Sequence, residues 1–134
     1  MTVDLKIQTL HPALGAEVVG LDLAESMDDE TFQAIRDAWM KHLVLAFPNQ
    51  TLSDEQQITF SQRFGALEEH HQDIIKSRSS PQIFRVSNVN DEGNMMPSDH
   101  PSVAQISLAQ RWHTDSSYRA VPSMGSILHG IEVT

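Results

Sequence analysis

The chain has 134 residues, a formal net charge of -9 at pH 7 and no cysteine. Such a length allows one hydrophobic core, and 40% hydrophobic against 20% charged residues is typical of a globular protein. The acidic balance argues against nucleic acid as a partner, because binding to phosphates depends on Lys and Arg. No apolar run reaches the length of a membrane span and the first residues lack a secretion signal, so we expect a cytoplasmic protein without membrane association.

The first fifty residues predict two strands, a helix and a third strand. Apolar and polar residues alternate over 3–9, the pattern of a half-buried strand, and 16–23 predicts a second short strand. Apolar residues then recur at helical spacing behind acidic residues, which predicts a helix over 29–42. The continuous apolar run 43–47 predicts a strand that is buried on both faces.

A second helix and a long loop are expected in the middle of the chain. Ser53 with Gln56 three residues later matches a capping box, and we expect the helix that it starts to end at Gly65. The stretch 83–87 predicts a further strand. Residues 88–109 are rich in Asn, Asp, Gly, Pro and Ser without a sustained period, so we expect a long loop of the kind that often forms a lid or a binding segment.

A His and an Asp two residues apart form the most informative motif. Side chains at i and i+2 of a strand leave the same face, so His113 and Asp115 could both reach one divalent metal ion. With a distant second His they would make the facial triad of non-haem Fe(II) oxygenases. Taken alone, the motif also fits an exposed loop or a carboxylate that merely orients an imidazole. Trp112 would face away from the ligands and is expected to pack.

The remaining candidates lie on either side of this motif. A last strand is predicted over 126–133, and its His129 is expected to line a pocket or the core. Arg111 and Arg119 flank the metal strand, where they either attract an anionic substrate or are ordinary surface residues. The chain then stops in the middle of a predicted sheet. We therefore expect a single domain over 1–134 that is truncated at its C-terminus.

A series of motifs follows along nearly the whole chain. In order they are GLDL (20–23), LVLAF (43–47) with Gln50, LSDEQ (52–56), RFGALE (63–68), SNV (87–89), WHTDSSY (112–118) and PSMGSIL (122–128). Together these motifs resemble the taurine and 2,4-dichlorophenoxyacetate dioxygenase family, whose members are Fe(II)- and 2-oxoglutarate-dependent oxygenases. The SSY end of the metal motif is more similar to the phenoxyacetate branch than to the taurine branch.

The resemblance implies a mainly β fold with flanking helices, a double-stranded β-helix (jelly roll, cupin-like) that is incomplete in this chain. It implies Fe(II) held by His113 and Asp115, 2-oxoglutarate as co-substrate, and O₂. The expected reaction is hydroxylation of a small anionic organic substrate, either a taurine-like sulfonate or a phenoxyalkanoate-like carboxylate. The family's Gly-Gly-Asp-Thr segment, distal His and 2-oxoglutarate-binding Arg come later in the chain. We expect these cofactor-binding residues beyond Thr134, and little or no activity from this fragment alone.

Two neighbouring histidines are candidates for binding the substrate. His70 follows the RFGALE motif, where the resemblance to taurine-type members implies a histidine that meets the anionic group of the substrate. His71 could fill the same place, and both could instead form a solvated pair after a helix. Ala109 stands where the taurine branch has an Asn, which argues against taurine itself.

Two readings of other classes remain open. The first is a non-catalytic binding or oligomerisation module, in which the edge of an incomplete β-roll pairs with a second chain to give a homo-oligomer. The second is a zinc-dependent cupin-like enzyme that uses His113, Asp115 and His129 as ligands.

Overall fold

The computed structural model describes residues 5–69, 80–90, 92–107 and 110–132. The chain divides into two compact units, Met1–Gly65 and Ala66–Thr134. The single domain expected over 1–134 stays a prediction. None of the helices in the described ranges is long and apolar enough to cross a membrane.

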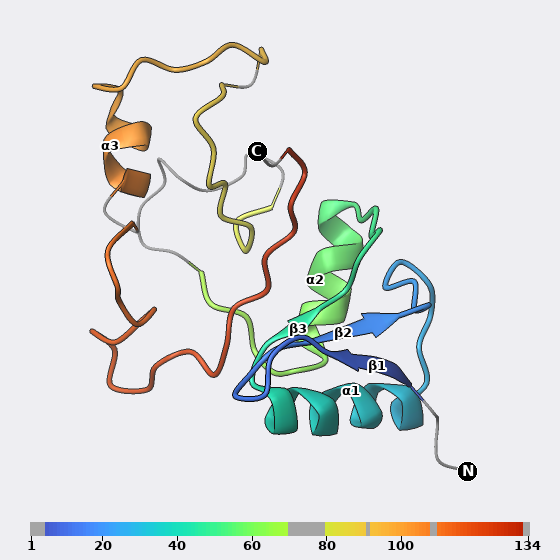
Figure 1. The fold of residues 1–134 in the computed structure, drawn as a ribbon. Helices are drawn as coiled ribbons and strands as arrows, with labels where there is room; N and C mark the ends of the chain where they lie inside the picture. Colours follow the sequence, from blue (N-terminus) through green and yellow to red (C-terminus); the bar gives the residue numbers. More distant parts are fainter. Residues whose placement is uncertain (1–4, 70–79, 91, 108–109, 133–134) are drawn as a thin grey trace. The chain divides into compact units, whose positions relative to one another are not determined.

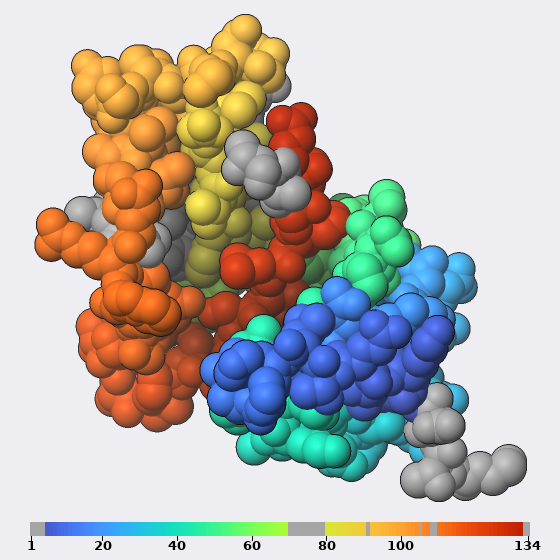
Figure 2. Space-filling view, viewed as in Figure 1, coloured from blue at the N-terminus to red at the C-terminus, as the bar shows by residue number. Residues whose placement is uncertain are grey.

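The first unit contains a small three-stranded sheet (Figure 1). Its strands are β1 (Lys6–Thr9), β2 (Ala16–Val19) and β3 (Leu45–Ala46), in the order β1-β2-β3. The β1–β2 pair is antiparallel and the β2–β3 pair is parallel. The residues of β1 are exposed, and Figure 2 shows them in blue on the surface of the unit. The strand predicted over 3–9 is thus an exposed edge strand that begins at Lys6, and residues 3 and 4 lie outside the described ranges.

Helix α1 (Asp29–His42) has the bounds that the sequence predicts. Asp28 caps its first turn, because the N–H of Thr31 donates to the Asp28 carboxylate at 2.7 Å. The apolar stripe turns Phe32 and Ile35 into the interior, where both are buried. The helix thus forms from local signals, a polar cap followed by apolar residues at helical spacing.

Helix α2 (Asp54–Gln62) confirms the capping box, since the Ser53 side chain accepts from the N–H of Gln56 and the Gln56 side chain accepts from the N–H of Ser53. Its buried Phe60 packs edge to face with Phe64 at 5.4 Å between ring centroids. Phe64 also meets Phe32 of α1, at 4.8 Å. Such edge-to-face pairs bring the positive edge of one ring to the negative face of the next. The aromatic residues therefore join the two helices in the core of this unit.

The second strand is shorter than the 16–23 that the sequence predicts. It ends at Val19, and Gly20 then has a φ of 86°, a left-handed conformation that favours glycine. Beyond this turn the Gln50 side chain replaces a partner strand. Its oxygen accepts from the N–H of Leu23 and its amide donates to the carbonyl of Leu21, both at 2.8 Å.

The prediction of a fully buried strand over 43–47 is wrong in extent and in burial. Only Leu45 and Ala46 pair with β2, and both are half-buried. Leu43 instead ends α1 with a φ of 65°, and its N–H donates to the carbonyl of Trp39. Its side chain and that of Val44 are exposed. The first two residues of the apolar run are thus used to terminate the helix.

The second unit holds less regular structure than the sequence predicts. Helix α3 (Pro101–Ser107) lies within 88–109, which was expected to be a loop throughout. The stretches 83–87 and 126–132 form no strand, and residue 133 lies outside the described ranges. An isolated bridge joins Val89 to Met95. The described residues therefore form a small sheet with few helices, and the jelly roll stays a prediction.

Candidate metal centre

The His-x-Asp motif lies on irregular backbone that leads into a turn. The strand expected to carry His113 and Asp115 is not formed: His113 has no regular structure and Asp115 begins a turn that continues through residue 118. A strand needs a partner to bond its backbone groups, and no described segment pairs with this one. The turn closes through the N–H of Arg119, which donates to the carbonyl of Ser116 at 3.0 Å.

The two side chains of the motif nevertheless meet. The Nε2 atom of His113 and the Oδ1 atom of Asp115 are 3.1 Å apart. Two adjacent ligand atoms on an octahedral metal would be about 3.0 Å apart for bonds of about 2.1 Å, close to the usual metal–nitrogen and metal–oxygen lengths. About half of each side chain is exposed, 48% for His113 and 60% for Asp115. The spacing is that of a direct hydrogen bond and also fits two adjacent ligands of a divalent cation, to which the exposure of both side chains gives access.

The His113 ring is oriented by its other nitrogen. Nδ1 lies 2.7 Å from the carbonyl oxygen of Arg111, to which it donates. Because a carbonyl only accepts, Nδ1 carries a proton. Nε2 then donates to Asp115 in the imidazolium form, and in the neutral form its lone pair faces the position that a metal would take. The carbonyl of Arg111, and after it the charge of Asp115, raise the pKa of His113 above its ordinary value. The orientation of the ring and the raised pKa have the same consequence. The position between the ring and the carboxylate favours a positive charge, either a proton or a metal ion.

The second oxygen of Asp115 is also tied. The hydroxyl of Ser126 donates to Oδ2 at 2.9 Å. Oδ1 is thereby left to face His113, so the carboxylate would offer a metal one oxygen rather than two. Each candidate ligand thus has one atom directed at the shared position and one atom held by a neighbour, an arrangement typical of metal sites.

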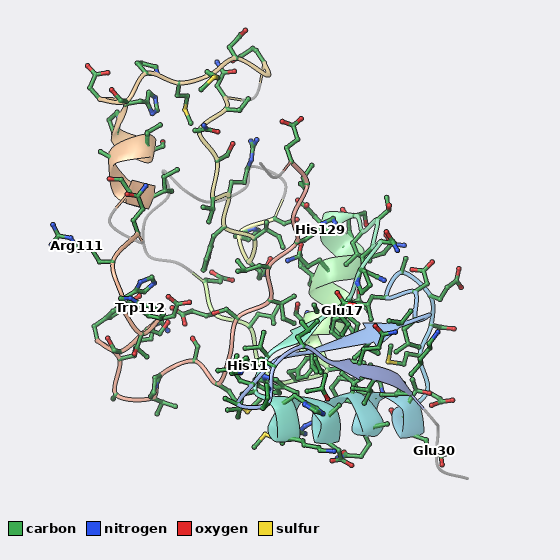
Figure 3. All side chains as sticks on the ribbon, viewed as in Figure 1. His11, Glu17, Glu30, Arg111, Trp112 and His129 are labelled. Atoms are coloured by element: carbon green, nitrogen blue, oxygen red, sulfur yellow. The ribbon has the colours of Figure 1, made fainter. Side chains whose placement is uncertain are left out.

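A third protein ligand does not join the pair within the described ranges, where no group of three His, Cys, Asp or Glu side chains could hold a metal. His129 is half-buried on an irregular segment and lies apart from Trp112, the neighbour of His113, in Figure 3. The structure therefore gives no support to the zinc site of His113, Asp115 and His129. His70 and His71 lie outside the described residues, as does Ala109.

The residues flanking the pair differ from expectation. Trp112 is fully exposed, so the prediction that it packs across a strand is wrong. Without a strand there is no opposite sheet face for the indole to cover. Arg111 is exposed, and its side chain points away from the chain trace in Figure 3.

Sequence reasoning missed Glu68, which binds the turn that follows the metal pair. Its Oε1 atom lies 2.9 Å from the Arg119 guanidinium, and its Oε2 atom accepts from the hydroxyls of Ser116 and Ser123. The sequence offered two signals, the place of Glu68 at the end of the RFGALE motif and the hydroxyl-rich composition after Asp115, but neither names a partner 48 residues away.

These features define a candidate mononuclear metal centre of which this chain supplies one His and one Asp. The family description "Taurine catabolism dioxygenase TauD, TfdA family" matches residues 6–134. The chain belongs to this family, which confirms the resemblance found in its motifs.

Curated relatives include a (S)-phenoxypropionate/alpha-ketoglutarate-dioxygenase of Delftia acidovorans, 35% identical over 131 residues, with 95% of this chain and 42% of the relative covered. An alpha-ketoglutarate-dependent 2,4-dichlorophenoxyacetate dioxygenase of Cupriavidus pinatubonensis is 32% identical over 130 residues, which cover 92% of this chain and 44% of that relative. The chain thus spans less than half the length of these relatives. Among solved structures, AAD-2 in complex with Mn(II) and N-oxalylglycine matches with a TM-score of 0.76 and 29% identity, over 88% of this chain and 40% of that one.

Proposed function

We propose that the protein is an Fe(II)- and 2-oxoglutarate-dependent dioxygenase that hydroxylates a small phenoxyalkanoate-like carboxylate. The observation that carries the proposal is the 3.1 Å separation between His113 Nε2 and Asp115 Oδ1, with the second polar atom of each side chain held elsewhere. Family membership and the names of the relatives support the reaction class. We also propose that the complete fold is a jelly roll and that the enzyme is cytoplasmic.

The chain's own residues would prepare the site in three ways. The carbonyl of Arg111 keeps the Nε2 lone pair of His113 available, and Asp115 brings a negative charge that offsets part of the charge of Fe(II). The exposure of both side chains leaves room for a third protein ligand and for the co-substrate. When bound, Fe(II) with 2-oxoglutarate and O₂ would supply the oxidising chemistry that breaks a C–H bond of the substrate.

A phenoxyalkanoate is favoured over taurine by two observations. Relatives that act on phenoxypropionate and 2,4-dichlorophenoxyacetate are 35% and 32% identical to this chain. The sequence also has Ala109 where the taurine branch has an Asn. We propose that His70 or His71 contacts the carboxylate of the substrate, on the basis of their position after the RFGALE motif.

The test uses the full-length protein with Fe(II), 2-oxoglutarate and O₂. Hydroxylation of the carbon next to the ether oxygen should make the product collapse and release a phenol, in step with formation of succinate. We expect both products with (S)-phenoxypropionate or 2,4-dichlorophenoxyacetate and little turnover with taurine. The His113→Ala variant should lose turnover, whereas the matched control His129→Ala should retain it. Succinate without substrate dependence, or full activity in His113→Ala, would contradict the proposal.

A further inference from the structure

The turn that follows the metal pair is closed on a carboxylate from a distant part of the chain. Glu68 accepts from the hydroxyl of Ser116 at 2.7 Å and from the hydroxyl of Ser123 with the same oxygen, Oε2. Its other oxygen forms an ion pair with Arg119 at 2.9 Å. One carboxylate thus binds three residues within an eight-residue segment, 116–123. All of these groups belong to the unit Ala66–Thr134.

These contacts are of the kind that holds a loop in one conformation. The Glu68 side chain is 19% exposed and that of Arg119 is 38% exposed, so the pair is screened less than a fully exposed one. Hydrogen bonds to an ionised carboxylate are shorter and stronger than those between neutral groups. Arg119 also donates to the carbonyl of Glu69 at 3.3 Å, which ties the guanidinium to the backbone beside its partner.

The conformation that Glu68 holds is one that the backbone does not prefer. Ser116 has a φ of 54°, in the left-handed region that a residue with a Cβ atom rarely adopts. Such a residue keeps its conformation only when its surroundings hold it. Ser116 directly follows Asp115, and the segment that it begins leads through Ser123 to Ser126, whose hydroxyl donates to Oδ2 of the Asp115 carboxylate at 2.9 Å. The Ser116 hydroxyl is held by Glu68.

We propose that Glu68 is a positioning residue of the metal centre. Through Ser116, Ser123 and Arg119 it holds the turn after Asp115 and keeps the Asp115 carboxylate in reach of the ion that His113 binds. The inference rests on the proposed function and deepens it, because it assigns to Glu68 a role in metal affinity without direct contact with the metal. Loss of the Glu68 charge should weaken metal binding even though both ligands remain.

The experiment measures Mn(II) binding by the metal-stripped full-length protein, through the electron paramagnetic resonance signal of the free ion. Glu68→Gln keeps the size of the side chain but replaces one oxygen with a donor that cannot pair with Arg119. We expect about tenfold weaker binding, since residues that orient ligands typically contribute ten- to a hundredfold. The control Glu92→Gln neutralises an exposed carboxylate of the same unit and should bind as the wild type does.

A second pair of variants tests the route through Arg119. Arg119→Gln should weaken Mn(II) binding by a similar factor. The double variant Glu68→Gln/Arg119→Gln should bind Mn(II) only slightly more weakly than either single variant, because the effects of coupled residues are not additive. Full additivity would show that the two residues act separately and would overturn the route. Thermal unfolding of each variant is measured alongside. A lowered melting temperature with unchanged Mn(II) affinity would make Glu68 purely structural and overturn the inference.

The His113→Ala variant separates this inference from the proposed function. If His113→Ala abolishes Mn(II) binding while Glu68→Gln binds like the wild type, the metal centre stands and the role of Glu68 is wrong. If the wild-type protein itself binds no Mn(II), or His113→Ala binds it fully, both the metal centre and the role of Glu68 are wrong.

Discussion

Orientation is the property that separates His113 and Asp115 from an ordinary pair of exposed polar residues. The imidazole is held through Nδ1 by the Arg111 carbonyl, and the carboxylate is held through Oδ2 by the Ser126 hydroxyl. Neither side chain therefore has to give up much rotational freedom when an ion arrives, which lowers the entropic cost of binding. The spacing of two residues in the sequence sufficed to bring the side chains together, although the strand expected to present them is absent from the described residues.

The hydroxyl of Ser126 should make a measurable contribution to metal affinity. Ser126→Ala removes the donor to Asp115 Oδ2, so the carboxylate can rotate away from His113. We expect Mn(II) binding by the full-length protein to weaken about two- to tenfold, the range given by the net worth of one hydrogen bond. Ser126→Thr keeps a hydroxyl and should restore most of the affinity. Ser117→Ala, at an exposed serine of the neighbouring turn, is the control, and an equal loss there would refute a specific role for Ser126.

At the level of elements, helices α1 and α2 could be predicted from the sequence, whereas helix α3 was missed and the strands predicted over 83–87 and 126–132 are not formed. A helix satisfies its own backbone, so the caps at Asp28 and Ser53 with apolar residues at helical spacing determine α1 and α2 locally. The pairing of a strand depends on a second segment that the pattern of one segment does not reveal, so the sequence predicts strands over 83–87 and 126–132, where the described residues have only the bridge residue Phe84. The contact of Glu68 with Ser116 is equally non-local and could not be read from the motif.

The cap of α1 predicts a specific pH dependence of stability. The N–H and hydroxyl of Thr31 lower the pKa of Asp28 below its ordinary value of 3.8. A carboxylate whose pKa is lower in the folded state than in the unfolded state stabilises the folded protein. This contribution is complete at pH values above the unfolded-state pKa, and it disappears as the pH falls through the folded-state pKa. The free energy of unfolding should therefore fall on acidification below about pH 4, by an amount that depends on the charge of Asp28.

Asp28→Asn tests this assignment, because the amide keeps an oxygen that can cap the helix but carries no charge to lose. In urea unfolding of the full-length protein, the difference in stability between neutral and acidic pH should be smaller in Asp28→Asn than in the wild type. Glu25→Gln, an exposed residue of the preceding loop, should leave the difference unchanged. An identical pH dependence in Asp28→Asn and in the wild type would refute the linkage.

For the whole molecule, the second unit exposes more large apolar side chains than a stable monomer usually shows. Four of these side chains have more than four-fifths of their surface accessible to solvent: Trp112, Val121, Leu128 and Ile131. The relatives are more than twice as long as the part of them that this chain spans, and we propose that in a chain of that length the further residues cover these side chains.

The 134-residue chain by itself should consequently self-associate without a defined stoichiometry. Exposed apolar surface attracts further copies in many orientations, and an exposed edge strand such as β1 adds another route to pairing. Light scattering after size exclusion should give a polydisperse profile for this chain and a single species for the full-length protein, with stronger binding of a hydrophobic dye to the shorter form. A monodisperse dimer or higher oligomer of the 134-residue chain would instead favour the oligomerisation module, because a genuine module buries its apolar surface in one defined interface whereas an uncovered core surface has no preferred partner.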